Sequence, residues 1–203
     1  MAGLLWMLAD LSLEGVERVP RSGPLIVVSN HLHYCDPPLL GGVLPRYIRF
    51  MAKKEVFKPP WGLIFTNAYG AFPVRRNELD RRALRDAECV LRQGGVVGMF
   101  PEGHRSHGHG LQRAFGGAAL IARRSKAPVL PVGISGTEAV FRTRPRWPIC
   151  VRVGNAFEVR TGCPLDESTA DLMRHIADLL PPQYQGVYGR LPTPDSRLLT
   201  QVP

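Results

Sequence analysis

The chain of 203 residues has a mass of 22.5 kDa, a length that suits one α/β domain and allows a buried core without disulfides or metals. Hydrophobic residues make up 44% and charged residues 21% of the sequence, which excludes wholesale disorder. A formal charge of +9 favours binding to a polyanion such as nucleic acid, an anionic lipid surface or a phosphorylated substrate.

The first residues are apolar but lack the features of a spanning or targeting segment. The run 3–13 contains Asp10 and is too short to cross a bilayer, and neither a cationic stretch before it nor a small-residue cleavage site after it indicates a secretory signal. We expect a short apolar helix here, with residues 1–14 as an N-terminal segment. The four cysteines are scattered without close pairing, which is typical of reduced thiols in the cytosol.

Short apolar runs alternate with amphipathic segments through the rest of the chain. The apolar runs have strand length and predict buried strands at 25–29, 47–52, 71–74, 96–100, 128–134 and 149–153. Helices are predicted within 56–69 and at 78–92, 115–125 and 166–180. Asn77 is the expected N-cap of the helix at 78–92, and Pro73 restricts its own strand to an edge or an end of the sheet.

This alternation of strands and helices predicts an α/β fold. We expect a single domain over 15–189, in which helices flank a mixed but mostly parallel sheet. Residues 190–203 are expected to form a flexible tail. No internal repeat or low-complexity block divides the chain.

A group of polar residues follows the predicted strand at 25–29, where open α/β sheets place their catalytic groups. His31 and Asp36 would point about 140° apart on a continuous helix, so they can meet only across a turn. Pro37 favours such a turn, because proline disfavours helical geometry at the residue before it and suits the first helical position. The spacing leaves two interpretations: Asp36 orients His31 as a general base, or Asp36 caps a helix while the backbone satisfies His31.

Two further loops carry charged residues after strands. A predicted buried strand is followed by Glu102, Gly103 and Arg105, where a guanidinium and a carboxylate can hold a polar, phosphorylated ligand. Arg75 and Arg76 end another short strand and can bind a phosphate dianion. Taken singly, each pattern is more often that of an ordinary surface loop.

Together these blocks resemble the glycerolipid acyltransferase family, of the lysophosphatidic acid acyltransferase type. The family's motifs N-H-x4-D, G-x-F-x-V-x-R, F-P-E-G-x-R-S and V-x-P-V are matched in order by residues 30–36, 70–76, 100–106 and 129–132. The resemblance extends from about residue 15 to residue 188. Four motifs in the right order are far more specific than any one of them alone.

The resemblance implies acyl transfer from a thioester to the free hydroxyl of lysophosphatidate, without a covalent enzyme intermediate. In this scheme His31, oriented by Asp36, deprotonates the hydroxyl. The resemblance assigns the acceptor's phosphate to Arg76, Glu102, Gly103 and Arg105, and the acyl site to Val129 and Pro131. It implies no cofactor apart from the acyl-CoA or acyl carrier protein that donates the acyl group. With the positive charge, it also implies a peripheral position at the cytoplasmic face of an anionic membrane.

Other interpretations of the same residues stay open. Another acceptor, such as glycerol-3-phosphate or an amino-lipid, fits the same chemistry, and the sequence names neither the donor nor the acyl chain length. Histidines and cysteines in two loops suggest zinc, but their spacings match no common zinc pattern. The arginine-rich stretch 142–152 suggests a nucleic-acid-binding module, but no signature of one accompanies it. We expect neither a metal nor nucleic acid as a partner.

Overall fold

A computed structural model describes residues 9–57, 70–74, 80–106, 109–139 and 147–189 of the chain. These residues contain seven strands in one sheet, in the order β1-β7-β6-β2-β5-β3-β4. Neighbouring strands are parallel except for β6 and β7, which are antiparallel. The strands are β1 (Ala9–Glu14), β2 (Leu25–Ser29), β3 (Ile48–Lys53), β4 (Phe72–Val74), β5 (Val96–Met99), β6 (Val129–Ser135) and β7 (Trp147–Val153). The predicted α/β fold with a mostly parallel sheet is confirmed, and β4, which contains Pro73, is an edge strand.

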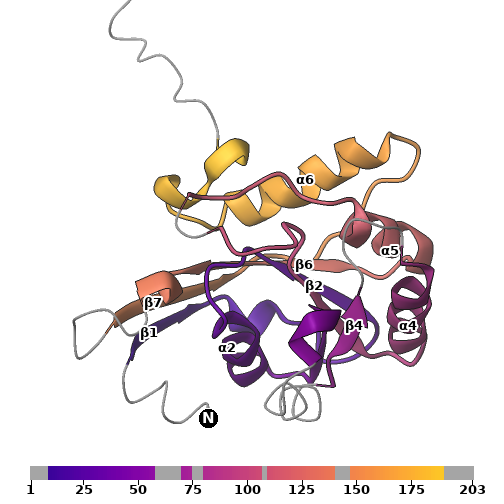
Figure 1. Cartoon of the computed structure of the whole chain (residues 1–203), viewed down its shortest axis with the longest axis horizontal. Helices are drawn as coiled ribbons and strands as arrows, with labels where there is room; N and C mark the ends of the chain where they lie inside the picture. The colour runs from indigo at the N-terminus through magenta and orange to yellow at the C-terminus, as the bar shows by residue number, and fades with distance from the viewer. Residues whose placement is uncertain (1–8, 58–69, 75–79, 107–108, 140–146, 190–203) are drawn as a thin grey trace, which may run out of the picture.

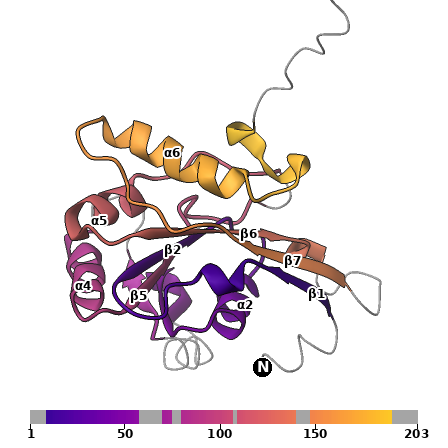
Figure 2. The same cartoon turned by 180° about the vertical axis from the view of Figure 1, so that it is seen from behind.

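Helices cover both faces of this sheet (Figures 1 and 2). The α-helices are α2 (Asp36–Val43), α4 (Arg81–Arg92), α5 (Gly117–Ser125) and α6 (Leu165–Ala177). The 3-10 helices are η1 (Val16–Arg18), η2 (Lys54–Phe57), η3 (Thr137–Ala139), η4 (Pro182–Tyr184) and η5 (Gly186–Tyr188). In the described part of the chain, no helix combines the length and the apolar character needed to cross a membrane.

The central strand β2 explains this layering, because all five of its residues are buried. Ile26 and Val28 pack into the core that α4, α5 and α6 share, on one face of the sheet. Leu25 and Val27 pack into the core that contains α2, on the other face. Alternate side chains of a strand point to opposite faces, so an unbroken apolar run is what a strand covered on both sides requires.

The helix α4 begins at Arg81 rather than at residue 78, and its cap differs from the predicted one. The Asp80 carboxylate accepts hydrogen bonds from the backbone N–H groups of Arg82 and Ala83, at 3.0 and 3.1 Å. The predicted N-cap, Asn77, is therefore wrong and lies outside the described residues. The predicted apolar face is correct, since the buried residues of the helix are Ala83, Leu84, Ala87, Val90 and Leu91.

The helix predicted within residues 1–14 is wrong for its second half. Ala9–Glu14 form β1, which pairs in parallel with β7. Leu11 and Leu13 are half-buried against the core, whereas Ser12 and Glu14 are exposed, so this segment has the period of two of a strand with one buried face. Residues 1–8, the greater part of the predicted helix at 56–69, and the predicted tail at 190–203 lie outside the described residues.

Three neighbouring parallel strands bring three loops to one edge of the sheet. β5, β2 and β6 lie side by side, with β2 in the middle. They end at Met99, Ser29 and Ser135, and because they are parallel their carboxyl ends meet at the same edge. Ligands of open α/β sheets bind at this edge. The loops that leave this edge carry His31, Glu102 and Arg105.

Candidate active site

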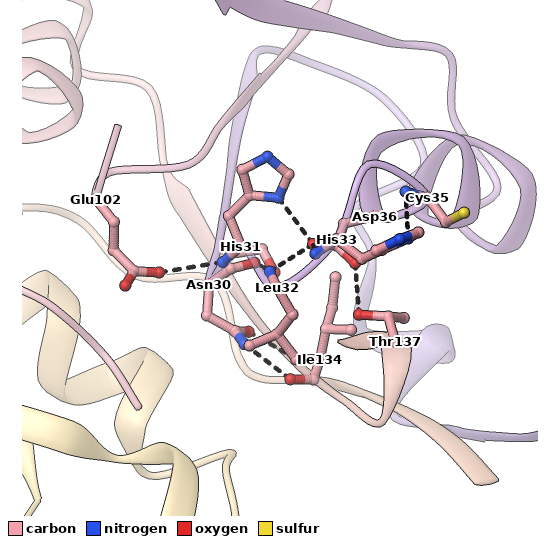
Figure 3. Close-up of polar contacts among 10 residues, drawn as sticks. Asn30, His31, Leu32, His33, Cys35, Asp36, Glu102, Ile134 and Thr137 are labelled. Carbon is pink, nitrogen blue, oxygen red and sulfur yellow. Dashed lines mark hydrogen bonds and ion pairs between the residues drawn. The ribbon is translucent and has the colours of Figure 1, made fainter. Parts of the chain in front are cut away.

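The loop between β2 and α2 brings His31 and Asp36 together. His31 Nδ1 lies 2.8 Å from Asp36 Oδ2, and the same oxygen accepts hydrogen bonds from the backbone N–H groups of Leu32 and His33, at 2.7 and 2.8 Å (Figure 3). The loop closes as a turn, in which the Asp36 N–H donates to the His33 carbonyl at 3.1 Å. Pro37 follows directly at the start of α2. The two residues therefore meet across a turn, as the sequence predicts.

These contacts orient the His31 ring. Asp36 Oδ2 acts as an acceptor toward two backbone N–H groups, so Nδ1 of the imidazole is the donor toward it and Nε2 carries the lone pair. The ring stacks on Phe100, which follows β5, with 4.3 Å between ring centroids and 23° between ring planes. The His31 side chain is 14% exposed, so it lies at the rim of the buried region. The arrangement suits a general base that acts through Nε2.

Two polar side chains tie this loop to the end of β6. The Asn30 amide donates to the Ile134 carbonyl and accepts from the Ile134 N–H, both at 2.8 Å (Figure 3). The Thr137 hydroxyl, at the start of η3, donates to Asp36 Oδ1 at 2.7 Å. Asn30, Asp36 and Thr137 are all buried. The histidine loop is therefore anchored both through its backbone and through its carboxylate.

Glu102 ties the same loop to the segment after β5. Its carboxylate is fully buried, and its two oxygens accept from the backbone N–H groups of His31 at 3.1 Å and Gln112 at 2.8 Å. Burial raises the pKa of Glu102 to about 7, against the opposing effect of these two hydrogen bonds. Through these contacts Glu102 holds the backbone of His31 in place. A contact between Glu102 and the acceptor's phosphate stays a prediction.

Gly103 shapes the loop between β5 and α5. Its φ of 70° lies in the left-handed region, and a Cβ there would come within 2.8 Å of the Phe115 ring. Its N–H donates to the Phe100 carbonyl at 3.0 Å, which closes a turn. A role of Gly103 in binding the acceptor's phosphate stays a prediction.

Arg105 lies beside the histidine loop and contacts Tyr34. Its guanidinium carbon is 3.8 Å from the centroid of the Tyr34 ring, and Nη2 donates to the Tyr34 hydroxyl at 3.0 Å. Tyr34 is 64% exposed, so this pair faces solvent. Arg76, the other predicted phosphate ligand, lies outside the described residues.

The predicted acyl-site residues Val129 and Pro131 belong to the core. Both are buried in β6, and the Val129 side chain packs in the cluster shared with α4, α5 and α6. Their backbones join β6 to the segment 154–157, since the Val129 N–H donates to the Phe157 carbonyl and the Gly154 N–H donates to the Pro131 carbonyl. The role of the two residues at an acyl site stays a prediction.

Two ionisable side chains beside His31, those of Cys35 and His33, have shifted pKa values. Burial raises the pKa of the Cys35 thiol, and the nearby Asp36 carboxylate adds to this, so a nucleophilic thiolate is disfavoured. Burial also lowers the pKa of His33, more than Asp36 raises it. Among the described residues, no group of three or more histidine, cysteine, aspartate or glutamate side chains is placed to hold a metal ion.

Three residues of the site had no role in the sequence prediction. Phe100 and Tyr34 lie inside the matched motifs, and their place in these motifs is the feature of the sequence that could have pointed to them. Thr137 follows a buried strand and a glycine, as the other site loops follow β2 and β5. Its contact with Asp36 depends on the alignment of β6 beside β2, which the sequence does not display.

A mostly parallel sheet with a carboxylate-bound histidine at its carboxyl edge is an arrangement that α/β enzymes use for ligand binding and acid–base chemistry. Residues 10–135 match the family model described as Acyltransferase, and the chain belongs to this family. The chain is 35% identical over 122 residues to a 1-acyl-sn-glycerol-3-phosphate acyltransferase of Bacillus subtilis, covering 59% of this chain and 60% of that protein. It is 28% identical over 160 residues to the Streptococcus pneumoniae protein of the same name, covering 77% and 59%. The chain thus spans about three fifths of the length of these two relatives.

A solved structure of a protein with a similar name has a similar fold. The crystal structure of the 1-acyl-sn-glycerophosphate (LPA) acyltransferase PlsC from Thermotoga maritima is similar to this chain with a TM-score of 0.70 and 26% sequence identity. The similarity covers 86% of this chain and 72% of that one. The likeness therefore extends over most of this chain.

Proposed function

We propose that the protein transfers a fatty acyl group from an acyl thioester to the free hydroxyl of lysophosphatidate, which makes phosphatidate. The observation that carries the proposal is the 2.8 Å contact between His31 Nδ1 and Asp36 Oδ2, which leaves Nε2 as the proton acceptor. The names of the relatives support the choice of lysophosphatidate as acceptor.

In the proposed reaction the acceptor hydroxyl gives its proton to His31 Nε2 while its oxygen attacks the thioester carbonyl carbon. The carbon–sulfur bond then breaks, and the leaving thiolate takes the proton from Nε2, so the products are an ester and a free thiol. Asp36 stabilises the imidazolium that forms between these steps. The raised pKa of Cys35 supports direct transfer rather than an acyl-cysteine intermediate.

The acceptor's phosphate is assigned to Arg105, together with Arg76. Arginine is suited to this role because its planar guanidinium forms paired hydrogen bonds with phosphate oxygens. Arg105 lies close enough to His33 for its charge to lower the pKa of that side chain, which supports a phosphate site beside the histidine loop. Acyl-CoA or acyl carrier protein is the proposed donor, with no other cofactor.

The proposed place of action is the cytoplasmic face of an anionic membrane, where the protein binds peripherally. The formal charge of +9 favours such a surface, and the lipid acceptor resides there. Sedimentation with vesicles that contain anionic lipid, compared with neutral vesicles, tests this part of the proposal.

The central test compares His31→Ala with the wild-type protein in an assay of thiol release from acyl-CoA and lysophosphatidate. Removal of a general base lowers turnover on the order of 10²- to 10⁴-fold, and circular dichroism checks that the variant stays folded. The matched control is His175→Ala, because His175 is an exposed histidine on α6 whose ring stacks on Phe157. Wild-type turnover in folded His31→Ala would refute the mechanism.

A panel of acceptors tests the substrate. Lysophosphatidate, glycerol-3-phosphate and an amino-lipid are compared at equal concentration with the same acyl-CoA. We expect the fastest thiol release, with matching formation of phosphatidate, for lysophosphatidate. A preference for either of the other two would keep His31 as the base and change the acceptor.

A further inference from the structure

We propose that Thr137 is a positioning residue of the acyl-transfer reaction: its hydroxyl holds the Asp36 carboxylate in the orientation that directs Oδ2 to His31. The inference rests on the proposed function where it concerns turnover. Thr137 lies 101 positions beyond Asp36 in the chain and touches neither His31 nor the acceptor side of the ring in the described contacts.

The two oxygens of Asp36 have unequal surroundings. Three donors converge on Oδ2, namely the His31 ring and the backbone N–H groups of Leu32 and His33. Within the described part of the chain, Oδ1 receives its hydrogen bond from the Thr137 hydroxyl, at 2.7 Å. Both residues are fully buried, so water does not replace this donor (Figure 3). Thr137 therefore holds the side of the carboxylate that the three donors on Oδ2 do not reach.

The backbone conformation at Gly136 places the Thr137 hydroxyl close to Asp36. Gly136 has a φ of 90°, and a Cβ there would come within 2.0 Å of the Pro148 carbonyl oxygen. Only glycine fits this turn, which ends β6 and brings Thr137 back over the histidine loop. The paired hydrogen bonds between Asn30 and Ile134 hold β6 and the loop in register, so the hydroxyl reaches Oδ1 at a fixed place.

The hydroxyl has an electrostatic effect as well as a geometric one. A donor on Oδ1 disperses the negative charge that Asp36 presents to His31. Without it, the carboxylate attracts the His31 proton more strongly, and a buried acceptor is left unsatisfied. Loss of the hydroxyl therefore makes the His31 imidazolium harder to deprotonate. The acid limb of the pH–rate profile is then expected at higher pH.

Other ionisable groups face the same pair and titrate or carry charge beside it. They are His33 and Cys35 from the same loop, Glu102 and Arg105 from the segment after β5, and Glu138 from η3, which is hydrogen-bonded to Tyr184. The test must therefore compare variants in which all of these groups are retained.

The test uses Thr137→Val, which removes the hydroxyl at nearly constant volume, and Thr137→Ser, which keeps it. For Thr137→Val we expect kcat to fall about 10- to 100-fold with little change in KM, because a displaced base slows the chemical step without changing the contacts that bind the substrate. The acid limb of the pH–rate profile should move to higher pH by about half a unit or more. Thr137→Ser should restore both kcat and the limb to within about twofold of the wild type.

The matched control is Thr169→Val in α6. Thr169 is also buried, and its hydroxyl donates to the Leu165 carbonyl at 2.8 Å, remote from the histidine loop. This variant loses a buried hydrogen bond of the same kind, so it reports any general effect of that loss. We expect an unchanged acid limb for Thr169→Val.

A second readout needs no substrate. NMR titration of the His31 ring protons in the full chain should show a higher midpoint in Thr137→Val than in the wild type or Thr137→Ser. If Thr137→Val does not fold, Thr137→Ala removes the same hydroxyl without placing a methyl group against Asp36, and the same shift is expected. An unchanged midpoint, or equal impairment of the serine and valine variants, overturns the inference.

The outcomes separate the inference from the proposed function. Full activity in folded His31→Ala would refute the proposed base, while the NMR midpoint of the Thr137 variants would still measure the contact with Asp36. Loss of activity in His31→Ala, together with wild-type behaviour of Thr137→Val, would refute the role of Thr137 alone.

Discussion

The candidate site has a buried half and an exposed half, which are held by different kinds of contact. The buried half consists of His31, Asp36, Glu102 and Thr137, and the last three of these are fully buried. The exposed half is the pair Tyr34 and Arg105, with Tyr34 64% exposed. Hydrogen bonds from the backbone and from a buried hydroxyl hold the first half, whereas one stacked cation and one solvent-facing hydrogen bond hold the second.

This difference shows how the site divides its tasks. A buried polar group that loses its partner costs 1–3 kcal/mol, so the buried half has little freedom to move. A cation over an exposed ring contributes only about 0.5–1 kcal/mol, so the exposed half can adjust. Proton transfer requires atoms within hydrogen-bond reach, while a phosphate can be held in several ways. This difference fits the proposed function, in which the rigid half carries the base and the adjustable half holds the acceptor's charged end.

The strongest way to break the buried half is Asp36→Asn. The amide can still accept from the loop N–H groups through its oxygen and donate to the Thr137 hydroxyl, so the fold should persist. It lacks the charge that stabilises the His31 imidazolium, and turnover should fall on the order of 10³-fold. Thiol release under saturating substrate measures this effect.

The control for Asp36→Asn is Asp86→Asn on α4, a surface carboxylate 3.9 Å from its partner Arg82 one turn earlier. It should change turnover by less than about twofold, because exposed pairs of this kind contribute little. Equal activity of Asp36→Asn and the wild type would show that the buried half does not serve the chemistry.

Glu102→Gln tests the same half through the backbone. Its amide has one acceptor oxygen for the two N–H groups of His31 and Gln112, so one N–H would face an NH₂ group. We expect a loss of about 1–3 kcal/mol in the free energy of unfolding, measured with urea, and a roughly tenfold loss of turnover. Glu158→Gln, on an exposed glutamate, should leave both unchanged.

The effect of Glu102→Gln should also depend on pH. Burial raises the pKa of Glu102 in the folded protein to about 7, from an ordinary value of 4.5. Between these values the folded protein holds the proton more tightly than the unfolded chain does, so this group's contribution to stability is full below the lower value and decreases as pH rises to about 7. The difference in unfolding free energy between wild type and Glu102→Gln should therefore shrink from about pH 5 to about pH 7.5. A difference that grows over this range would contradict the assignment.

The sequence predicts the local contacts of the site but not the contacts between residues far apart in the chain. The turn that joins His31 and Asp36 follows from residues five apart with a proline after them, so local chemistry suffices. The strand at 25–29 follows from a continuous apolar run, and the structure confirms its bounds. The contacts of Glu102 and Thr137 link positions 71 and 101 apart, and they depend on the order of β5, β2 and β6 in the sheet.

The placements that the sequence did not predict have physical causes of the same kind. A glutamate between a proline and a glycine has the local pattern of a surface loop, yet Glu102 is buried. Its burial is tolerated because each carboxylate oxygen accepts a hydrogen bond from a backbone N–H group. Val129 and Pro131 lie in a family motif, yet β6 needs them in the core. The segment 9–14 is apolar enough for a helix, but its alternation of half-buried and exposed residues suits pairing with β7. Burial is a property of the assembled sheet, so a local pattern does not decide it.

The smallest expected effect belongs to the exposed half and sharpens the comparison. Tyr34→Leu removes both the ring under the Arg105 guanidinium and the hydroxyl that accepts from it. KM for lysophosphatidate should rise about two- to fivefold with kcat nearly unchanged, as expected for a contact of about 0.5–1 kcal/mol that acts on binding. Tyr34→Phe keeps the ring and should change KM by less than about twofold. Tyr47→Leu, on a tyrosine 61% exposed at the opposite edge of the sheet before β3, is the control. A fall in kcat at constant KM for Tyr34→Leu would place Tyr34 with the rigid half and remove the distinction.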